Sequence, residues 1–528
     1  MPSSGPVTPP RPILFHPWSG LDSRMVALLA LIFLALYGYE LFQFTFSIDE
    51  EYASSWTNPA LNWLSQGRWG MALVSGLLPP IWAMPFLSTA LFGLGLIFAA
   101  PALANLFGYA PAEATVFCVV FSLSPIWPHI VEFSTLSYGV GIGLITFSLG
   151  SHLMFQRGAV PLFMAVVLLS FTIAIYQTFA VLGALVVVNV ALRHSTARSR
   201  SESSASLASI LLRGGVVLAL AILASLGTGV LALRGFGLEI HHIQGYVRVG
   251  DYFHSFEHAF TKSLDRALGF VAGTNDTYLD WGLPILALPA LGLAVILWDA
   301  LFSRRRSIGT TMGTLVLVAA AGIISVVPFF FTAGETPARA LVWFPLLFAM
   351  LSAATLQLAR ARLLIWILLG VNILAGSFIS NALFYSDKLA REQDRVVAYD
   401  LFRRIEKLRR APLDQPIPFT LVGAHHSQEP VRRVEVFGAS FFGWDEGNVF
   451  RAHSYLHFLG ARGLRPIDIA DAPGKVVIAS ASMPSWPAPE SVAWIGEMMV
   501  VKLSPMTHEQ RYRICRTHKE KDALRVCQ

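Results

Sequence analysis

Three consecutive carboxylates, Asp49, Glu50 and Glu51, directly follow the first long apolar stretch of the chain, residues 25–46. Adjacent like charges raise one another's pKa, and a carboxylate tuned in this way is suited to accept a proton from a hydroxyl group. We therefore take Asp49 and Glu50 as candidate general bases, and Asp49 first because it is nearest to the apolar stretch. Glu51 is a candidate binding residue beside them. The alternative is that all three are solvated charges at a helix end.

A second group of residues that could take part in chemistry combines aromatic, amide and cationic side chains. It consists of Trp63, Gln66, Arg68 and Trp69. An arginine gives a phosphate group a planar partner that is always charged, and an indole ring can stack on a sugar or a lipid. Arg339 offers the same kind of phosphate contact from a later loop. The alternative is an interfacial anchor, because Trp and Arg favour the membrane surface.

Weaker candidates lie in two expected turns. His129 and Glu132 are three residues apart, where they either bind substrate or cap the turn. Tyr176 and Gln177 interrupt an apolar stretch over residues 160–192, and polar groups at membrane depth are often functional.

One short motif matches a zinc peptidase pattern. His254, Glu257 and His258 form H-x-x-E-H, and His241 and His242 lie nearby. No third ligand can be assigned, so we favour a polar helix at the membrane interface and assign no metal site.

The elements that position these residues are mostly membrane spans. The chain has 528 residues, of which 54% are hydrophobic and 14% charged, whereas soluble domains have roughly 25% charged residues. The fold class is therefore mainly α, a polytopic helical membrane protein with about eleven spans and interfacial helices over residues 55–82. The eleven expected spans are residues 25–46, 85–107, 112–127, 134–155, two short spans within 160–192, 211–233, 283–302, 311–331, 338–358 and 363–384. Within residues 134–155, Gly139, Gly141 and Gly143 favour close helix packing.

Basic residues in short loops predict the orientation. They fall on one side of the expected spans, which should be the cytoplasm: Arg11, Arg24, Arg157, Arg193, Arg198, Arg200, Arg213, Arg304, Arg305, Arg306, Arg360 and Arg362. Topology thus explains the net charge of +6 better than binding to nucleic acid, which we do not expect as a partner. The candidate chemical residues then gather on the opposite side of the bilayer.

Three regions follow from this pattern. Residues 1–22 are rich in proline and should form a disordered cytoplasmic N-terminus. Residues 23–385 should form the membrane domain that carries the candidate bases, and residues 386–528 should form a small extracytoplasmic α/β domain. In that domain we expect a helix over residues 390–408 and strands at 419–422, 475–478 and 499–503. Cys515 and Cys527 could pair there, if the compartment is oxidising.

The order of these motifs resembles the bacterial O-antigen glucosyltransferase family, membrane glycosyltransferases of the GT-C class. The resemblance rests on residues 48–51, then on Trp63-x-x-Gln66-Gly67-Arg68-Trp69, and on weaker matches at Ser124-Pro125, Glu132-Phe133 and Tyr176-Gln177. It continues through Asp394, Asp400 and Ile405 and is clear again over residues 440–451, which include Trp444, Asp445 and Arg451.

The resemblance implies transfer of a sugar from a polyprenyl phosphate, such as undecaprenyl phosphate, to a lipopolysaccharide-like glycan at the periplasmic face of the bacterial inner membrane. The acidic pair of the family maps onto Asp49 and Glu50, and the third acid, Glu51, leaves open which carboxylate is the base. Trp444, Asp445 and Arg451 are then candidates for ordering the acceptor. No cofactor is required, although a divalent cation could bind at Asp49 and Glu50.

Three other functions compete with this interpretation. A transporter or flippase of lipid-linked sugars would share the many spans, but such proteins often contain internal repeats, and none is visible. A membrane metallopeptidase would use His254, Glu257 and His258. A non-catalytic membrane scaffold would leave the carboxylate cluster unexplained.

Overall fold

The membrane-spanning part of the chain is a bundle of apolar helices. The computed structural model describes residues 17–18, 22–78, 84–197, 207–239, 248, 250–302, 307–358, 361–410, 412 and 414–517. Within these ranges, seven helices are long and apolar enough to cross a membrane. They are α1 (Ser23–Phe42), α5 (Pro85–Leu106), α8 (Ser134–Met154), α11 (Leu207–Gly235), α14 (Gly282–Phe302), α15 (Ile308–Phe331) and α17 (Arg362–Leu408). The chain is therefore a polytopic helical membrane protein, as predicted.

Four shorter apolar helices coincide with the other expected spans. They are α6 (Pro111–Leu123), α9 (Ala159–Ile175), α10 (Phe179–Ala197) and α16 (Phe344–Ala354). As predicted, Tyr176 and Gln177 separate two short helices, α9 and α10.

The helices pack closely where the sequence supplies small residues. A Cβ atom on Gly141 of α8 would lie 2.6 Å from the Cα atom of Phe92 in α5, so only glycine permits this approach. Large apolar side chains of α11, among them Leu212, Leu223 and Leu231, are exposed on the outside of the bundle. Such a surface is suited to lipid rather than to water.

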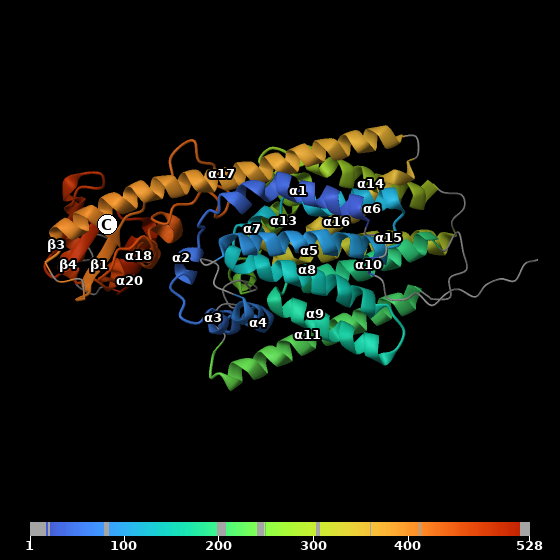
Figure 1. Cartoon of the computed structure of the whole chain (residues 1–528), viewed down its shortest axis with the longest axis horizontal. Helices are drawn as coiled ribbons and strands as arrows, with labels where there is room; N and C mark the ends of the chain where they lie inside the picture. The colour runs from blue at the N-terminus through green and yellow to red at the C-terminus, as the bar shows by residue number, and fades with distance from the viewer. Residues whose placement is uncertain are drawn as a thin grey trace, which may run out of the picture.

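Short helices gather at one end of the bundle, next to the C-terminal domain (Figure 1). They are α2 (Glu50–Ala53), α3 (Pro59–Ser65), α4 (Trp69–Leu77), α7 (Pro128–Val131), α12 (Asp251–His254), α13 (Phe256–Ala272) and the 3₁₀ turn η4 (Ala338–Ala340). The loops predicted to lie outside the cytoplasm are therefore brought to the same end.

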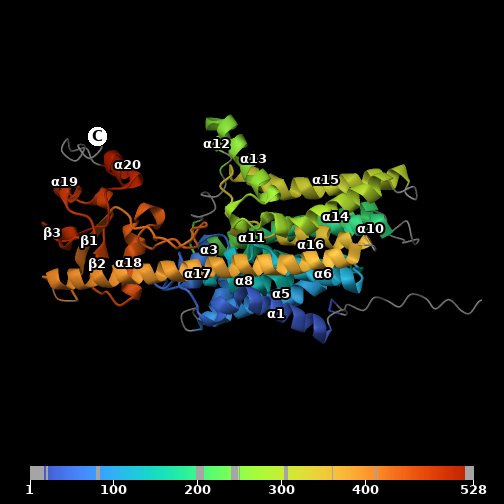
Figure 2. The same cartoon turned by 90° about the horizontal axis from the view of Figure 1, so that it is seen from above.

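The helix α17 joins the two parts of the molecule. Its 47 residues correspond to roughly 70 Å at 1.5 Å per residue. The helix passes without interruption through residue 385, where the sequence suggested a domain boundary, because residues 386–408 contain no glycine or proline. Figures 1 and 2 show it running from the far end of the bundle along the C-terminal domain.

The C-terminal domain contains a four-stranded sheet in the order β2-β1-β4-β3. The strands are β1 (Ile417–Val422), β2 (Leu464–Pro466), β3 (Val492–Ile495) and β4 (Met498–Lys502), and the helices around them are α18 (Val449–Phe458), α19 (Gly474–Ser482) and α20 (His508–Thr517). The central strand β1 pairs parallel with β2 and β4, whereas β3 pairs antiparallel with β4. The small α/β domain is therefore confirmed.

Two of the three predicted strands are confirmed, at residues 419–422 and 499–503, but the third is wrong. Residues 475–478 lie in α19, where Val476, Val477 and Ser480 are buried together. That spacing places the three side chains on one face of a helix, so burial of this face outweighs the strand preference of the valines. Cys515 in α20 is disulfide-bonded, and Cys527 lies outside the described residues.

Candidate functional site

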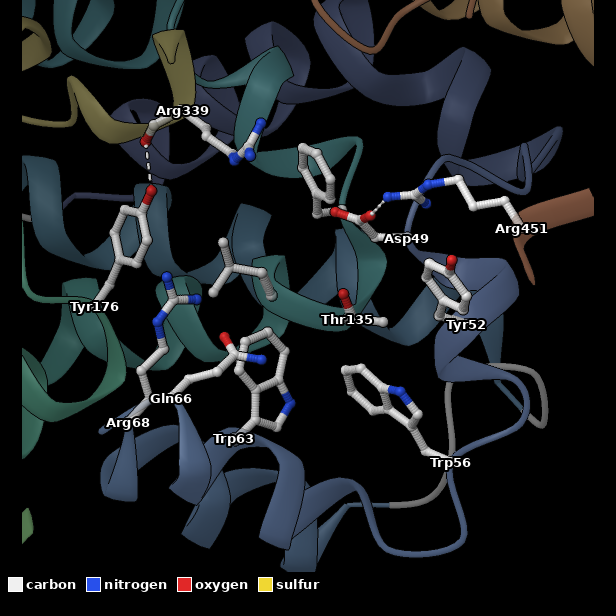
Figure 3. Close-up of a pocket in the computed structure, with 12 residues that line it drawn as sticks. Asp49, Tyr52, Trp56, Trp63, Gln66, Arg68, Thr135, Tyr176, Arg339 and Arg451 are labelled. Carbon is white, nitrogen blue, oxygen red and sulfur yellow. Dashed lines mark hydrogen bonds and ion pairs between the residues drawn. The ribbon is translucent and has the colours of Figure 1, made fainter. Parts of the chain in front are cut away.

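A pocket of about 280 Å3 opens where the bundle meets the C-terminal domain (Figure 3). The residues that line it are Asp49, Tyr52, Trp56, Trp63, Gln66, Arg68, Phe133, Thr135, Leu136, Tyr176, Arg339 and Arg451. Seven of the candidate residues meet here: Asp49, Trp63, Gln66, Arg68, Tyr176, Arg339 and Arg451. The pocket thus combines one carboxylate, three guanidinium groups and several aromatic rings from segments far apart in the sequence.

Asp49 presents its carboxylate to this pocket from a strained backbone. Its φ of 77° lies in the left-handed region, and its side chain forms no cap on the helix α2 that it precedes. A residue other than glycine in this conformation costs about 1–3 kcal/mol, and such strain is concentrated at functional sites. The side chain is 46% exposed and accepts a hydrogen bond of 2.9 Å from Nη2 of Arg451.

Arg451 reaches the pocket from α18 of the C-terminal domain. Besides Asp49, its guanidinium pairs with Glu51 through Nη1 and with Asp445 through Nε, the latter at 2.6 Å. It also lies 4.7 Å from the ring of Tyr52. Although burial acts in the opposite direction, the three carboxylates raise the pKa of Arg451. The C-terminal domain therefore completes the pocket wall with a permanent cation.

Glu51 supports this arrangement from below the pocket surface. It is fully buried, and one of its oxygens, Oε2, forms no hydrogen bond among the described residues. Burial raises the pKa of Glu51 to about 7, against the opposing effect of Arg451. Glu51 therefore changes its charge near neutral pH while it holds Arg451.

Glu50, the second candidate base, points away from the pocket. Its carboxylate accepts hydrogen bonds from the backbone N–H groups of Ser47 (2.9 Å) and Ser134 (2.8 Å), and from the Ser134 hydroxyl. Burial raises the pKa of Glu50 to about 8, although these hydrogen bonds oppose the shift. Glu50 thus ties the Asp49 loop to the first turn of α8, and Asp49 is the carboxylate of this pair that faces the pocket.

Arg68 and Arg339 line the side of the pocket opposite Arg451 (Figure 3). The guanidinium carbon of Arg68 lies 5.4 Å from the ring of Trp63 and 5.2 Å from that of Tyr176. The guanidinium carbon of Arg339 lies 4.6 Å from the ring of Phe133. Aromatic faces attract guanidinium groups, so both arginines are positioned by rings that also line the pocket.

The backbone around Arg339 is fixed from two directions. The Tyr176 hydroxyl donates a hydrogen bond of 3.1 Å to the carbonyl oxygen of Arg339. The adjacent Ala338 N–H donates one of 2.7 Å to Glu435 of the C-terminal domain. Both the turn between α9 and α10 and the C-terminal domain therefore position this cation.

Several candidate residues do not line the pocket. Trp69 donates a hydrogen bond of 3.0 Å to the carbonyl oxygen of Ser225 and so connects α4 to α11. Gln177 lies in the turn after Tyr176, away from the pocket wall. Asp445 contacts Arg451 from outside the pocket, and Trp444 lines a neighbouring cavity.

His129 lies within α7 and Glu132 is the C-cap of that helix, and both are buried. Burial lowers the pKa of His129 to about 4, and its Nδ1 atom lies 3.7 Å from Glu435. Glu132 accepts a hydrogen bond of 2.9 Å from the Ser47 hydroxyl. These contacts join α7 to the C-terminal domain and to the Asp49 loop, so both residues lie one layer behind the pocket.

Sequence reasoning missed five residues of the pocket wall. Tyr52 and Trp56 extend the run of aromatic residues between the acidic motif and Trp63, a signal that was present in the sequence. The other three are Phe133, Thr135 and Leu136. Phe133 was noted only within the weak Glu132-Phe133 match, and nothing in the sequence marks Thr135 and Leu136, which reach the pocket through the turn between α7 and α8.

The zinc peptidase motif is not assembled as a metal site. His254, Glu257 and His258 are exposed on α12 and α13, and His241 and His242 lie outside the described residues. Among the described residues, no cluster of three or more histidine, cysteine, aspartate or glutamate side chains could hold a metal ion. The three residues of the H-x-x-E-H motif thus lie on exposed surfaces of two short helices.

A family model described as Glucosyl transferase GtrII matches residues 38–356 of the chain. The match includes every pocket residue from Asp49 to Arg339, whereas Arg451 lies beyond it. No curated protein and no solved structure matches the chain.

Proposed function

The chain belongs to the GtrII glucosyl transferase family and is a membrane glycosyltransferase, and from this premise we propose its donor, acceptor and site. The donor is a sugar linked to polyprenyl phosphate, and the acceptor is a cell-envelope glycan of the O-antigen type. Transfer takes place on the periplasmic side of the inner membrane, in an enzyme of GT-C type. The pocket around Asp49 is the active site.

One observation carries this proposal: the half-exposed carboxylate of Asp49 shares a pocket with Arg68 and Arg339 at the end of the membrane helices. A sugar linked to a lipid phosphate brings a negative charge that remains near the bilayer surface. Guanidinium groups bind phosphate through planar, charge-assisted hydrogen bonds. A carboxylate within the same pocket is placed to remove a proton from an incoming hydroxyl group.

The reaction is a single displacement at the anomeric carbon. Asp49 accepts the proton of the acceptor hydroxyl, and the hydroxyl oxygen forms a bond to that carbon while the bond to the phosphate oxygen breaks. The departing polyprenyl phosphate keeps the electron pair, and Arg68 and Arg339 stabilise its charge. Configuration at the anomeric carbon is inverted. No cofactor takes part in these steps, and a divalent cation that bound here would meet Asp49 but not Glu50, which is turned away.

The proposed orientation of the chain in the membrane is supported by the positions of basic residues and by the disulfide of Cys515. Arg157 follows the C-terminal end of α8, and Arg193 and Arg213 donate hydrogen bonds to carbonyl groups at the C-terminal ends of α5 and α8. The pocket lies at the opposite, N-terminal end of α8, and basic residues favour the cytoplasmic side. The disulfide of Cys515 suits an oxidising compartment. We therefore place the N-terminus in the cytoplasm and the C-terminal domain in the periplasm.

Replacement of Asp49 tests the proposed base. With radiolabelled polyprenyl-phosphate sugars supplied one at a time to membranes containing the protein, Asp49→Asn should slow transfer to glycan by a factor of about 10²–10⁴. Its unfolding temperature should stay close to that of the unmodified chain, because the Asp49 side chain is half exposed.

Glu50→Gln is the matched control. In this variant, the side-chain NH₂ group would face one of the backbone N–H groups that now donate to Glu50. A buried donor without an acceptor lowers the free energy of unfolding by about 1–3 kcal/mol. The unfolding temperature should fall, while the correctly folded fraction still transfers sugar. Unchanged transfer in Asp49→Asn contradicts the assignment, and labelled lipid that crosses the bilayer without transfer favours a flippase.

A further inference from the structure

We propose that a second cavity beside the active-site pocket binds the acceptor glycan; this inference rests on the proposed function and assigns the acceptor site. The cavity has a volume of about 600 Å3 and lies between α13, the loop before η4 and the C-terminal domain. Its wall includes Asp265, Arg266, Thr336, Arg339, Glu435 and Trp444. Pockets for small ligands measure roughly 300–1,000 Å3, so the cavity has room for a saccharide.

The two cavities meet at Arg339, which lines both. Its backbone is held by the Tyr176 hydroxyl on one side and, through Ala338, by Glu435 on the other. A ligand in the second cavity therefore lies next to the guanidinium that we assign to the donor phosphate. This is the neighbourhood in which an acceptor hydroxyl must be presented.

The charges of the two cavities suit different ligands. In the active-site pocket, three arginines accompany one carboxylate, so an anion is favoured. In the second cavity, the three cations Lys262, Arg266 and Arg339 are balanced by the three carboxylates Asp265, Glu335 and Glu435. Carboxylates accept hydrogen bonds from hydroxyl groups and guanidinium groups donate them. A neutral ligand rich in hydroxyl groups matches this set.

Trp444 adds an apolar surface to the second cavity. It is half-buried in a turn of the C-terminal domain, next to Asp445, which holds Arg451. An indole ring offers a large rigid surface with a polar edge, and such a surface can lie against the C–H face of a sugar ring. The cavity therefore combines polar groups and one aromatic face, as recognition of a saccharide requires.

The second cavity lies outside the membrane helices, away from the bilayer that holds a lipid-linked substrate. Its walls come from α13, the 334–339 loop and the C-terminal domain, all outside the membrane helices. The active-site pocket, by contrast, is bounded by α3, the start of α4 and the turn between α9 and α10. A polyprenyl carrier can reach the first from the bilayer, whereas a glycan can enter the second from the periplasm.

The test measures initial rates of transfer against the concentration of each substrate, with delipidated O-polysaccharide of the strain that encodes the chain as acceptor. Trp444→Ala and Asp265→Asn should each raise the KM for the acceptor by about tenfold and leave the KM for the donor, measured at saturating acceptor, unchanged. The matched controls are Trp298→Ala, which is exposed at the far end of α14, and Asp276→Asn, which is exposed outside the cavity. Both controls should behave like the unmodified chain.

A binding measurement separates this inference from the proposed function. Saturation-transfer NMR with the same polysaccharide should detect binding to the Asp49→Asn protein and lose it in the Asp49→Asn, Asp265→Asn double variant. Detection in both proteins, or a changed donor KM with an unchanged acceptor KM, overturns the acceptor site. If no donor supports transfer by the unmodified chain, the proposed function fails, while loss of polysaccharide binding in the double variant still supports a glycan site.

Discussion

The charge of Arg451 is divided among three carboxylates, and this division sets the environment of Asp49. Glu51 is buried and Asp445 is half exposed, whereas Asp49 faces the pocket. An ion pair favours the charged form of a carboxylate and so makes it a weaker base. Because Glu51 and Asp445 pair with the same cation, Arg451 holds Asp49 less strongly, and the Asp49 oxygens stay more available to an acceptor hydroxyl.

The pH dependence of transfer should reveal this competition. Burial raises the pKa of Glu51 to about 7, so the residue is protonated below that pH and ionised above it. Below about pH 7, Arg451 is shared by two carboxylates instead of three, and its pairing with Asp49 strengthens. The rate should therefore fall as the pH decreases through about 7.

Glu51→Gln removes the titrating group but keeps its size. The variant should lose the inflection near pH 7 and show the low-pH rate throughout, as measured by kcat against pH. An inflection that persists in this variant contradicts the role of Glu51.

Single residues also show what a sequence can and cannot predict about the site. Asp49, Arg68 and Arg339 were predicted to act together because their chemistry is distinctive and membrane topology places their loops on one side. The opposite directions of Asp49 and Glu50 were not predictable, because they depend on the left-handed backbone at Asp49. The contribution of Tyr52 was overlooked although it lies only three residues further on.

Among the elements, α17 determines how the C-terminal domain sits on the bundle. Beyond the membrane, its Asp387 and Asp394 accept hydrogen bonds from the backbone N–H groups of Gly438 and Phe441, at 3.2 and 3.0 Å. Two turns further on, Asp400 accepts a hydrogen bond of 2.8 Å from the indole of Trp486. The helix therefore holds the domain at two separate points.

A kink between these points should disturb the active site from a distance. Val396 is 65% exposed on α17, and a proline there removes a helical hydrogen bond and costs about 3 kcal/mol. Val396→Pro should lower transfer at least tenfold because Arg451 and Glu435 lose their positions, while membrane insertion is kept. Val396→Ala, which preserves the helix, is the control, and equal activity of the two variants would show that the helix need not be rigid.

The elements themselves were largely predictable, for a physical reason. A bilayer requires apolar helices of a minimum length, and this constraint marks the spans in the sequence. Residues 475–478 were assigned wrongly because a short apolar run is compatible with a strand or with a buried helix face. The continuity of α17 was missed because hydropathy changes at residue 385 although helix propensity does not.

At the scale of the whole molecule, the ends of the bundle differ. The short helices α2, α3 and α4 and the C-terminal domain share one end, and the last turn of α14 and the first turn of α15 lie at the other (Figures 1 and 2). An enzyme that used a cytoplasmic nucleotide sugar would need the reverse orientation of its site. The side of the membrane that each end faces is therefore decisive for the identity of the donor.

Cysteine labelling in intact cells should determine this orientation. Glu497→Cys lies on an exposed turn of the C-terminal domain, and Gly309→Cys lies at the opposite end of the bundle near the start of α15. A maleimide that cannot cross the inner membrane should label the first at once and the second only after lysis. The background is low because Cys118 is buried and Cys515 is disulfide-bonded. The reverse labelling pattern would place the site in the cytoplasm.

Because Arg339 lines both cavities, the occupant of one cavity has a route by which to affect the other. If an occupant of one cavity shifts the guanidinium toward itself, the affinity of the other cavity changes by a certain factor, and the same factor must apply in the opposite direction. Donor and acceptor would then bind cooperatively or antagonistically, but not independently. A single side chain could in this way keep the activated sugar from reacting before a glycan has arrived.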